Sequence, residues 1–120
     1  MDKRHKQRIL IVQNLFSALY DNAASRKMLP TVIKILNNVK EIDKRIAIAA
    51  PKYEVGKIAK VDLSILRLAI YELTIEKKQP PKVIINEAIE LAKELASEKS
   101  PAFVNAVLGK IFEMDKKMYI

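Results

Sequence analysis

Residues 80–109, PPKVIINEAIELAKELASEKSPAFVNAVLG, contain two helical patterns that meet at Ser100 and Pro101. Apolar residues recur at intervals of three and four on both sides of this junction, which predicts two amphipathic helices. They are Ile84, Ala88, Leu91 and Leu95 before it and Val104, Val107, Leu108 and Ile111 after it. We expect the Ser100 hydroxyl to cap the second helix and Pro101 to occupy its first turn. The pattern therefore predicts an ordered corner between two packed helices.

Three further helices are expected upstream of this corner. Their ranges are about 3–20, 30–50 and 62–75, with a polar connection at 21–27 and a basic linker at 52–60 that holds at most one short helical turn. Pro30 fits the first turn of the second helix, and Asp62 is placed to cap the third. Apolar residues cover most of the circumference of the third helix, so we expect it to be central.

The composition favours a single all-α domain. The chain has 120 residues, half of them hydrophobic, with two glycines and no tryptophan, and this length suffices for one core. We expect one domain over 1–120, with an N-terminal helical half at about 3–50 and a C-terminal helical half at about 61–117. The absence of cysteine excludes disulfides and thiolate sites and fits a cytoplasmic location. No segment approaches the length of a membrane span, so no membrane association is expected.

The sequence offers no convincing catalytic or metal site. Glu87, Glu90 and Glu94 lie at helical spacing, but the only histidine, His5, is distant in sequence. We therefore interpret the glutamates as a solvated helix face, on which Glu90 pairs weakly with Lys93. No serine has a partnered histidine motif, and no phosphate-binding glycine loop is present. We expect no enzyme activity, no catalytic residues, no metal and no cofactor.

The charge of the chain points to an anionic partner. Twenty-two Lys and Arg against fourteen Asp and Glu give a net charge of +8, which alone does not distinguish nucleic acid from an acidic protein or a lipid surface. Four cations at the start of the first helix could each neutralise a phosphate. They are Lys3, Arg4, Lys6 and Arg8.

An aromatic ring beside such cations would favour single-stranded RNA, whose bases stack on exposed rings. Phe103 is the candidate ring, and at about 100° per residue it lies roughly a quarter-turn off the apolar stripe, with Asn105 on the other side. Residues in these places more often belong to the edge of a core or bond a neighbouring loop. Both interpretations remain open on periodicity alone.

Three stretches resemble the NusB family of transcription antitermination factors. They are KVIINEAIELAKELASEKSPAFVNAVL at 82–108, VDLSILRLAIYEL at 61–73, and the basic leader followed by VQNLF at 12–16. Together they cover more than half of the chain in the order of the family. The resemblance implies an all-α, NusB-like fold of two small packed helical bundles, one from each half of the chain.

The resemblance also implies binding of boxA-type single-stranded RNA together with the ribosomal protein NusE, in an antitermination complex with RNA polymerase. Carried over by position, it places Arg4, His5, Lys6 and Arg8 at phosphates, Phe16 and Phe103 near bases with Asn105 nearby, and Glu72 at the protein partner. Lys99 stands where an acidic residue is usual, which should strengthen the attraction to phosphate. The resemblance also allows a homodimer.

Two alternatives remain open. One is a NusB-like RNA-binding or interaction scaffold without boxA specificity, for example one associated with ribosomal RNA processing or with a methyltransferase. The other is a protein-only scaffold whose positive charge is incidental. The region between the first and second helices is short for the family, which could trim the partner surface.

Overall fold

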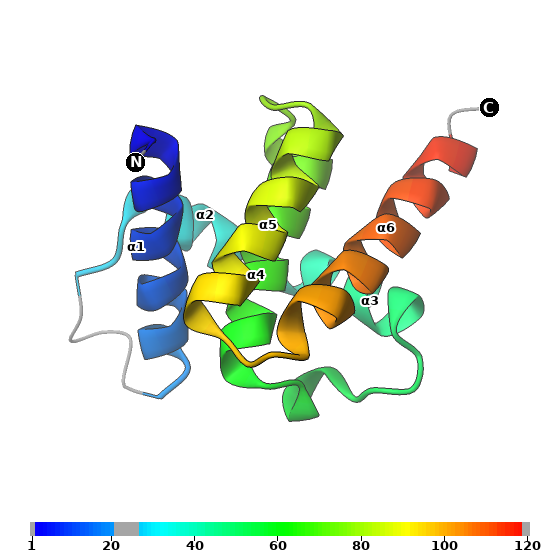
Figure 1. The fold of residues 1–120 in the computed structure, drawn as a ribbon, viewed down its shortest axis with the longest axis horizontal. Coiled ribbons are helices and arrows are strands. Elements are labelled where there is room, and N and C mark those ends of the chain that lie inside the picture. The colour runs from blue at the N-terminus through cyan, green and yellow to red at the C-terminus, as the bar shows by residue number, and fades with distance from the viewer. Residues whose placement is uncertain (1, 21–26, 119–120) are drawn as a thin grey trace.

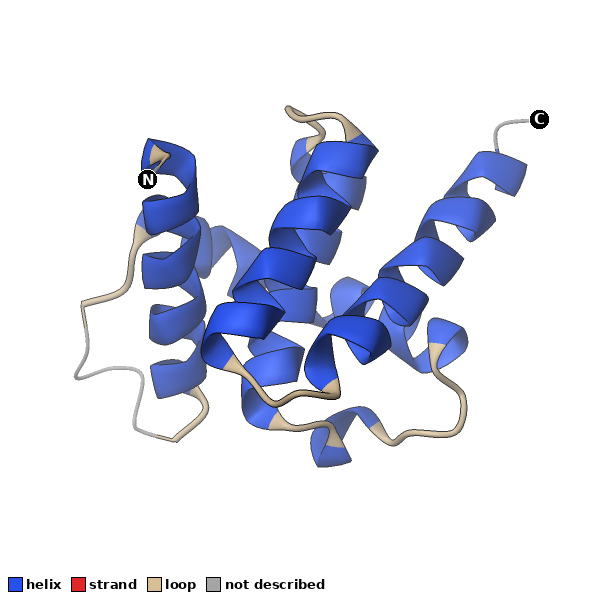
Figure 2. Cartoon of the chain, in the orientation of Figure 1, coloured by secondary structure: helices blue, strands red, loops and turns tan. Residues whose placement is uncertain are grey.

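The computed structural model describes residues 2–20 and 27–118, with side chains up to Lys116, and these stretches form α-helices joined by loops (Figure 2). The helices are α1 (Lys3–Ala18), α2 (Pro30–Asn37), α3 (Val39–Ala49), α4 (Lys60–Tyr71), α5 (Pro81–Leu95) and α6 (Ser100–Met118). A 3₁₀ turn, Val55–Lys57, precedes α4, and a π-helical turn, Glu72–Glu76, follows it. The predicted all-α class is confirmed. Most of the polar connection predicted at 21–27 lies outside the described residues.

Helix α4 is the central helix, as the sequence predicted. Nine of its side chains are buried, and α1, α5 and α6 all pack against it (Figure 1). Buried apolar side chains from all six helices join in one hydrophobic core. Each fully buried Leu or Ile stabilises the fold by roughly 1.5–3 kcal/mol relative to an exposed position. A helix with apolar side chains on nearly every face is therefore most stable in the middle of the molecule.

The second predicted helix is broken, and the expectation of one helix over 30–50 was wrong. Asn38 separates α2 from α3 with φ −109° and ψ 12°. Its side-chain amide donates to the Lys34 carbonyl at 2.8 Å, and its backbone N–H donates to the Ile35 carbonyl at 3.0 Å. Asparagine side chains compete in this way with the backbone hydrogen bonds of a helix. The bond from Asn38 therefore ends α2, and the chain changes direction before α3.

Two predicted helix caps were also wrong. Helix α4 begins two residues before Asp62, with Ala59 at its N-cap, so Asp62 belongs to the first turn. Helix α6 begins at Ser100 itself, whose hydroxyl accepts from the Ser97 backbone N–H at 3.2 Å and so braces the preceding loop.

The corner between α5 and α6 lies beside the C-terminal end of α1, and the start of α1 lies at the opposite end of the molecule (Figure 1). Helix α5 packs along α6 and α4, which fixes the corner on the core. Within 2–20 and 27–118, no helix combines the length and apolar character needed to cross a membrane. The basic start of α1 and the corner between α5 and α6 are therefore two separate regions of the surface.

Candidate nucleic-acid interface

The basic side chains of the leader fall on two faces of α1. Lys3, Arg4 and Lys6 are exposed, and Arg4 Nη1 donates to Gln79 Oε1 at 3.3 Å. Arg8, by contrast, is only 6% exposed. The buried residues of this helix are His5, Arg8, Val12 and Leu15. Their spacing is that of one helical stripe, so two of the predicted phosphate ligands belong to the face that packs on the protein.

His5 is clamped between two carboxylates of α5. Its Nδ1 lies 2.8 Å from Glu87 Oε2, and its Nε2 lies 2.7 Å from Glu94 Oε1. Ionised carboxylates only accept hydrogen bonds, so both bonds form together when the ring is the doubly protonated imidazolium. The bonds from Glu87 and then Glu94 raise the pKa of His5, against the opposing effect of burial. His5 therefore ties α1 to α5 as a cation.

The predicted solvated face is present at Glu90 and Glu94, whose side chains are 54% and 40% exposed. The prediction missed that Glu87 is only 26% exposed and that Glu87 and Glu94 both bond His5. The fold brings His5 to them across a long stretch of sequence, a contact that helical spacing within α5 does not reveal. The predicted weak pair on the same helix is present, with Lys93 Nζ 3.3 Å from Glu90 Oε1 and both side chains more than half exposed.

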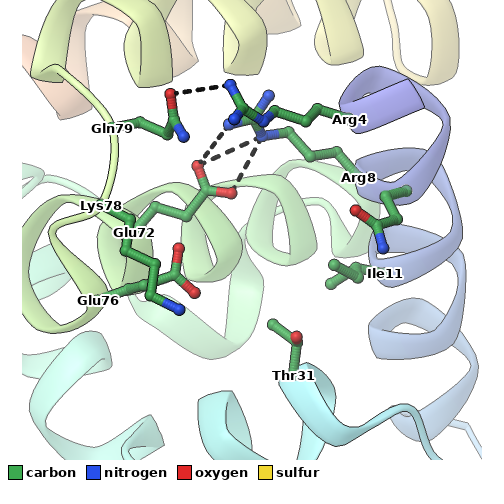
Figure 3. Close-up of a pocket in the computed structure, with 9 residues that line it drawn as sticks. Arg4, Arg8, Ile11, Thr31, Glu72, Glu76, Lys78 and Gln79 are labelled. Atoms are coloured by element: carbon green, nitrogen blue, oxygen red, sulfur yellow. Dashed lines mark hydrogen bonds and ion pairs between the residues drawn. The ribbon is translucent and has the colours of Figure 1, made fainter. Parts of the chain in front are cut away.

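Arg8 and Glu72 form a buried two-bond ion pair (Figure 3). Arg8 Nε donates to Glu72 Oε1 at 3.0 Å, and Nη2 donates to Oε2 at 3.1 Å. Arg8 Nη1 also lies 3.7 Å from Glu87 Oε2. Burial raises the pKa of the Glu72 carboxyl, and the bonds from Arg8 oppose that rise. The pair joins α1 to the π-helical turn that follows α4.

A cavity of about 310 Å³ lies in front of this pair. Arg4, Glu72, Glu76 and Lys78 line it with charges of both signs, from three parts of the chain (Figure 3). Glu72, the residue predicted to meet a protein partner, is thus buried in the wall of this cavity. Its carboxylate is already paired with Arg8. A partner would reach it only by entering the cavity.

The structure gathers the other predicted RNA residues at the corner between α5 and α6. Phe16 lines a cavity of about 630 Å³ with Tyr20 and Lys60. Lys99 and Phe103 line an adjoining cavity of about 200 Å³. The two cavities share part of their walls, namely Lys57, Ile58, Ala59, Asp62, Ser97 and Ser100. Asn105 is exposed on α6 and lines neither of them.

Several residues at this corner were missed by the sequence analysis. Tyr53 is 53% exposed, and its ring centroid lies 5.1 Å from that of Phe103 at an interplanar angle of 67°. Lys60 Nζ lies 5.4 Å from the centroid of the Tyr20 ring. The available signal was the linker at 52–60, which holds one aromatic residue, Tyr53, among three lysines, a combination found in surfaces that bind single strands.

The exposed leader and the corner are separate places on the surface. At 1.5 Å per residue, α1 holds Lys3 about 20 Å from Phe16. The first turn of α1 and the start of α6 accordingly lie at opposite ends in Figure 1. A ligand that touches both must be an extended chain that follows α1. Among the described side chains, no group of three or more His, Asp and Glu is arranged to hold a metal ion.

Comparison with known proteins identifies relatives of this chain. Transcription antitermination protein NusB of Geobacter sulfurreducens is 44% identical over 90 residues, which are 74% of this chain and 65% of that protein. The protein of the same name from Clostridium botulinum (strain Kyoto / Type A2) is 51% identical over 77 residues, which are 64% of this chain and 54% of that protein. The matches thus span between about half and two thirds of the length of these relatives.

Solved structures share the fold. T. maritima NusB matches with a TM-score of 0.80 and 27% identity, over 99% of both chains. A chain in the crystal structure of a plectonemic RNA supercoil matches with a TM-score of 0.75 and 22% identity, over 96% of this chain and 97% of that one, a likeness that shows the fold alone. The family model described as the NusB family matches residues 20–113. This chain therefore belongs to the NusB family.

Proposed function

We propose that this protein is a non-enzymatic transcription antitermination factor that binds boxA-type single-stranded RNA together with the ribosomal protein NusE, in a complex with RNA polymerase in the cytoplasm. The relatives reported above carry the name of transcription antitermination proteins. The observation that carries the proposal is the corner between α5 and α6, where aromatic rings and exposed lysines line adjoining cavities. Rings that stack on bases beside cations that meet phosphates are the usual means of holding a single strand.

In this proposal the RNA strand runs along α1 between the leader and the corner, and the whole chain acts as one binding unit. Lys3, Arg4 and Lys6 contact phosphates at one end. Lys99 does so at the other, while Phe16 and Phe103 lie near bases with Asn105 nearby. These assignments follow the exposed positions of the four cations and the place of both rings in the cavity walls.

His5 and Arg8 have a different part in the proposal. Because both side chains are buried in ion pairs, they hold α1 against α5 and the π-helical turn and so orient the exposed cations. The cavity at Glu72 is the proposed docking point for the protein partner, since Glu76 adds a second carboxylate to its wall.

Fluorescence anisotropy tests the proposal. A labelled boxA-like RNA and a scrambled RNA of equal length would be titrated at moderate and high salt, with and without NusE. We expect preference for the boxA-like RNA, and we expect NusE to strengthen it. Equal binding to both RNAs that disappears at high salt and does not respond to NusE would instead support a scaffold without boxA specificity.

A further inference from the structure

The start of α1 and the loop at 77–80 meet at one end of the molecule, opposite the corner between α5 and α6 (Figure 1). Arg4 Nη1 donates to Gln79 Oε1 at 3.3 Å, which joins two segments that are 75 positions apart in the sequence. Arg4, Lys78 and Gln79 line the same cavity (Figure 3). The fold therefore adds residues of this loop to the surface of the basic leader.

The cations of this end are exposed and without a carboxylate partner. We call this surface the basic end and define it by Lys3, Arg4, Lys6, Lys78 and Lys82, which are all exposed. Among the described residues, none of these five forms an ion pair. The side chain of Arg4 bonds only the neutral amide of Gln79, which leaves its charge uncompensated. These charges are therefore available to an anionic ligand.

Three carboxylates near the basic end limit where an anion can bind. Glu72 is buried, and Glu76 is half-buried in the wall of the cavity. Asp2 accepts a hydrogen bond from the backbone N–H of Arg4 at 3.3 Å and so caps α1. Because like charges repel, a phosphate is disfavoured inside the cavity beside the two glutamates. An anionic chain is therefore best placed across the exposed cations at the mouth of the cavity.

A single strand that follows α1 continues naturally onto the basic end. In the proposed function the strand runs along α1 from the corner to the leader. Lys78 lies in the wall of the same cavity as Arg4, and Lys82 lies in the first turn of α5. An acidic protein segment would also be attracted by these charges. Continuity with the proposed path favours RNA, which repeats its negative charge at every nucleotide.

We infer that the basic end binds the phosphates of RNA that flanks the boxA-type segment, through Lys78 and Lys82. The inference rests on the RNA-binding function proposed above. Contacts to phosphates position a nucleic acid and carry no sequence information. This end therefore lengthens the bound stretch of RNA and raises the affinity, without changing which sequence is preferred.

The first test uses the wild-type protein and lengthens the RNA. Fluorescence anisotropy would compare the boxA-like RNA with the same RNA extended by a short run of uridines at its 5′ or its 3′ end. We expect one of the two extensions, the one whose direction leads past the leader, to bind more tightly. It should increase the magnitude of the slope of log affinity against log salt by about 1.4, that is about 0.7 for each of two phosphates.

The second test changes the protein. The double variant Lys78→Gln/Lys82→Gln should return the slope for the tighter extended RNA to that of the unextended RNA. Lys40→Gln/Lys44→Gln is a matched control that removes the same charge, because both lysines are exposed on α3, which packs against α4 and α6. This control should keep the difference between the two RNAs. All four side chains are exposed, and circular dichroism melting would confirm that both variants are folded.

The outcomes separate this inference from the proposed function. Equal slopes for all three RNAs with the wild-type protein, or equal effects of the two double variants, would overturn the inference while leaving boxA binding intact. Loss of NusE binding in Lys78→Gln/Lys82→Gln, without any effect on RNA, would overturn it in favour of an acidic protein segment. Absence of binding to the boxA-like RNA and to both extended RNAs would overturn the proposed function as well.

Discussion

The buried face of α1 and the corner near the end of α1 use positive charge in opposite ways. On the buried face, His5 and Arg8 are paired with carboxylates of α5 and of the turn after α4. At the corner, Lys57 and Lys99 are exposed beside Tyr53. The first set of cations holds helices together, and the second is available to a ligand. Net charge therefore does not give the number of cations that are accessible to a partner. That number depends on how the helices pack.

Breaking the buried pair should have the largest effect. Arg8→Met leaves the buried Glu72 carboxylate without its partner, so we expect the free energy of unfolding to fall by about 3–5 kcal/mol. Urea unfolding followed by circular dichroism measures this loss. The double variant Arg8→Met/Glu72→Leu should recover most of it, because no buried charge then remains unpaired. A loss below about 1 kcal/mol in the single variant would mean that the pair behaves as an exposed one.

The two rings at the corner should differ in their effect on stability. Phe103→Ala should lower the free energy of unfolding by about 2 kcal/mol, roughly half the value for a fully buried phenylalanine, because Phe103 is half-buried against the core. Tyr53→Ala should change it by no more than about 0.5 kcal/mol, as is usual for exposed positions. Equal losses in urea unfolding of the two variants would contradict this difference in burial between the two rings.

The His5 clamp should make stability depend on pH. Because the hydrogen bonds to Glu87 and Glu94 raise the pKa of His5 above 6.5, the native state holds this proton more tightly than the unfolded chain. The stabilisation is therefore complete below pH 6.5 and is lost as pH rises through the raised pKa.

His5→Gln tests the size of this effect. We expect the free energy of unfolding to fall by about 1–2 kcal/mol just below pH 6.5. This is at the weak end for hydrogen bonds between charged groups, because the Glu94 side chain is 40% exposed. Thermal melts across the pH range should show a smaller decline for the variant than for the wild-type protein. His5 is the only histidine of the chain, so parallel curves would remove it as the origin of the decline.

The sequence predicted the helices because apolar spacing is a local signal. The stripes of α4, α5 and α6 all face the core as expected, and Pro30 begins α2. It missed the break at Asn38 because the competing bond to the Lys34 carbonyl depends on side-chain geometry rather than on hydropathy. The predicted cap at Asp62 was wrong because α4 begins three residues earlier than that cap implies, nearly one turn further toward the linker.

The candidate site was only partly predictable. Phe16, Lys99 and Phe103, which the resemblance to the NusB family assigns to RNA, line adjoining cavities, and their contact with RNA stays a prediction. The burial of His5 and Arg8 was not foreseen, because their partners on α5 and after α4 are distant in sequence. Ion pairs between helices leave no periodic trace in either segment, whereas a stripe of apolar residues does.

The most direct test of this account compares the salt dependence of RNA affinity for one exposed and one buried cation. Anisotropy with the boxA-like RNA would give the slope of log affinity against log salt for the wild-type protein, Lys6→Ala and the stabilised double variant Arg8→Met/Glu72→Leu. We predict that Lys6→Ala lowers the magnitude of the slope by about 0.7, the value for one phosphate of a single strand, and that the double variant leaves it unchanged. An unchanged slope for Lys6→Ala together with a lowered slope for the double variant would contradict the division between exposed and buried cations.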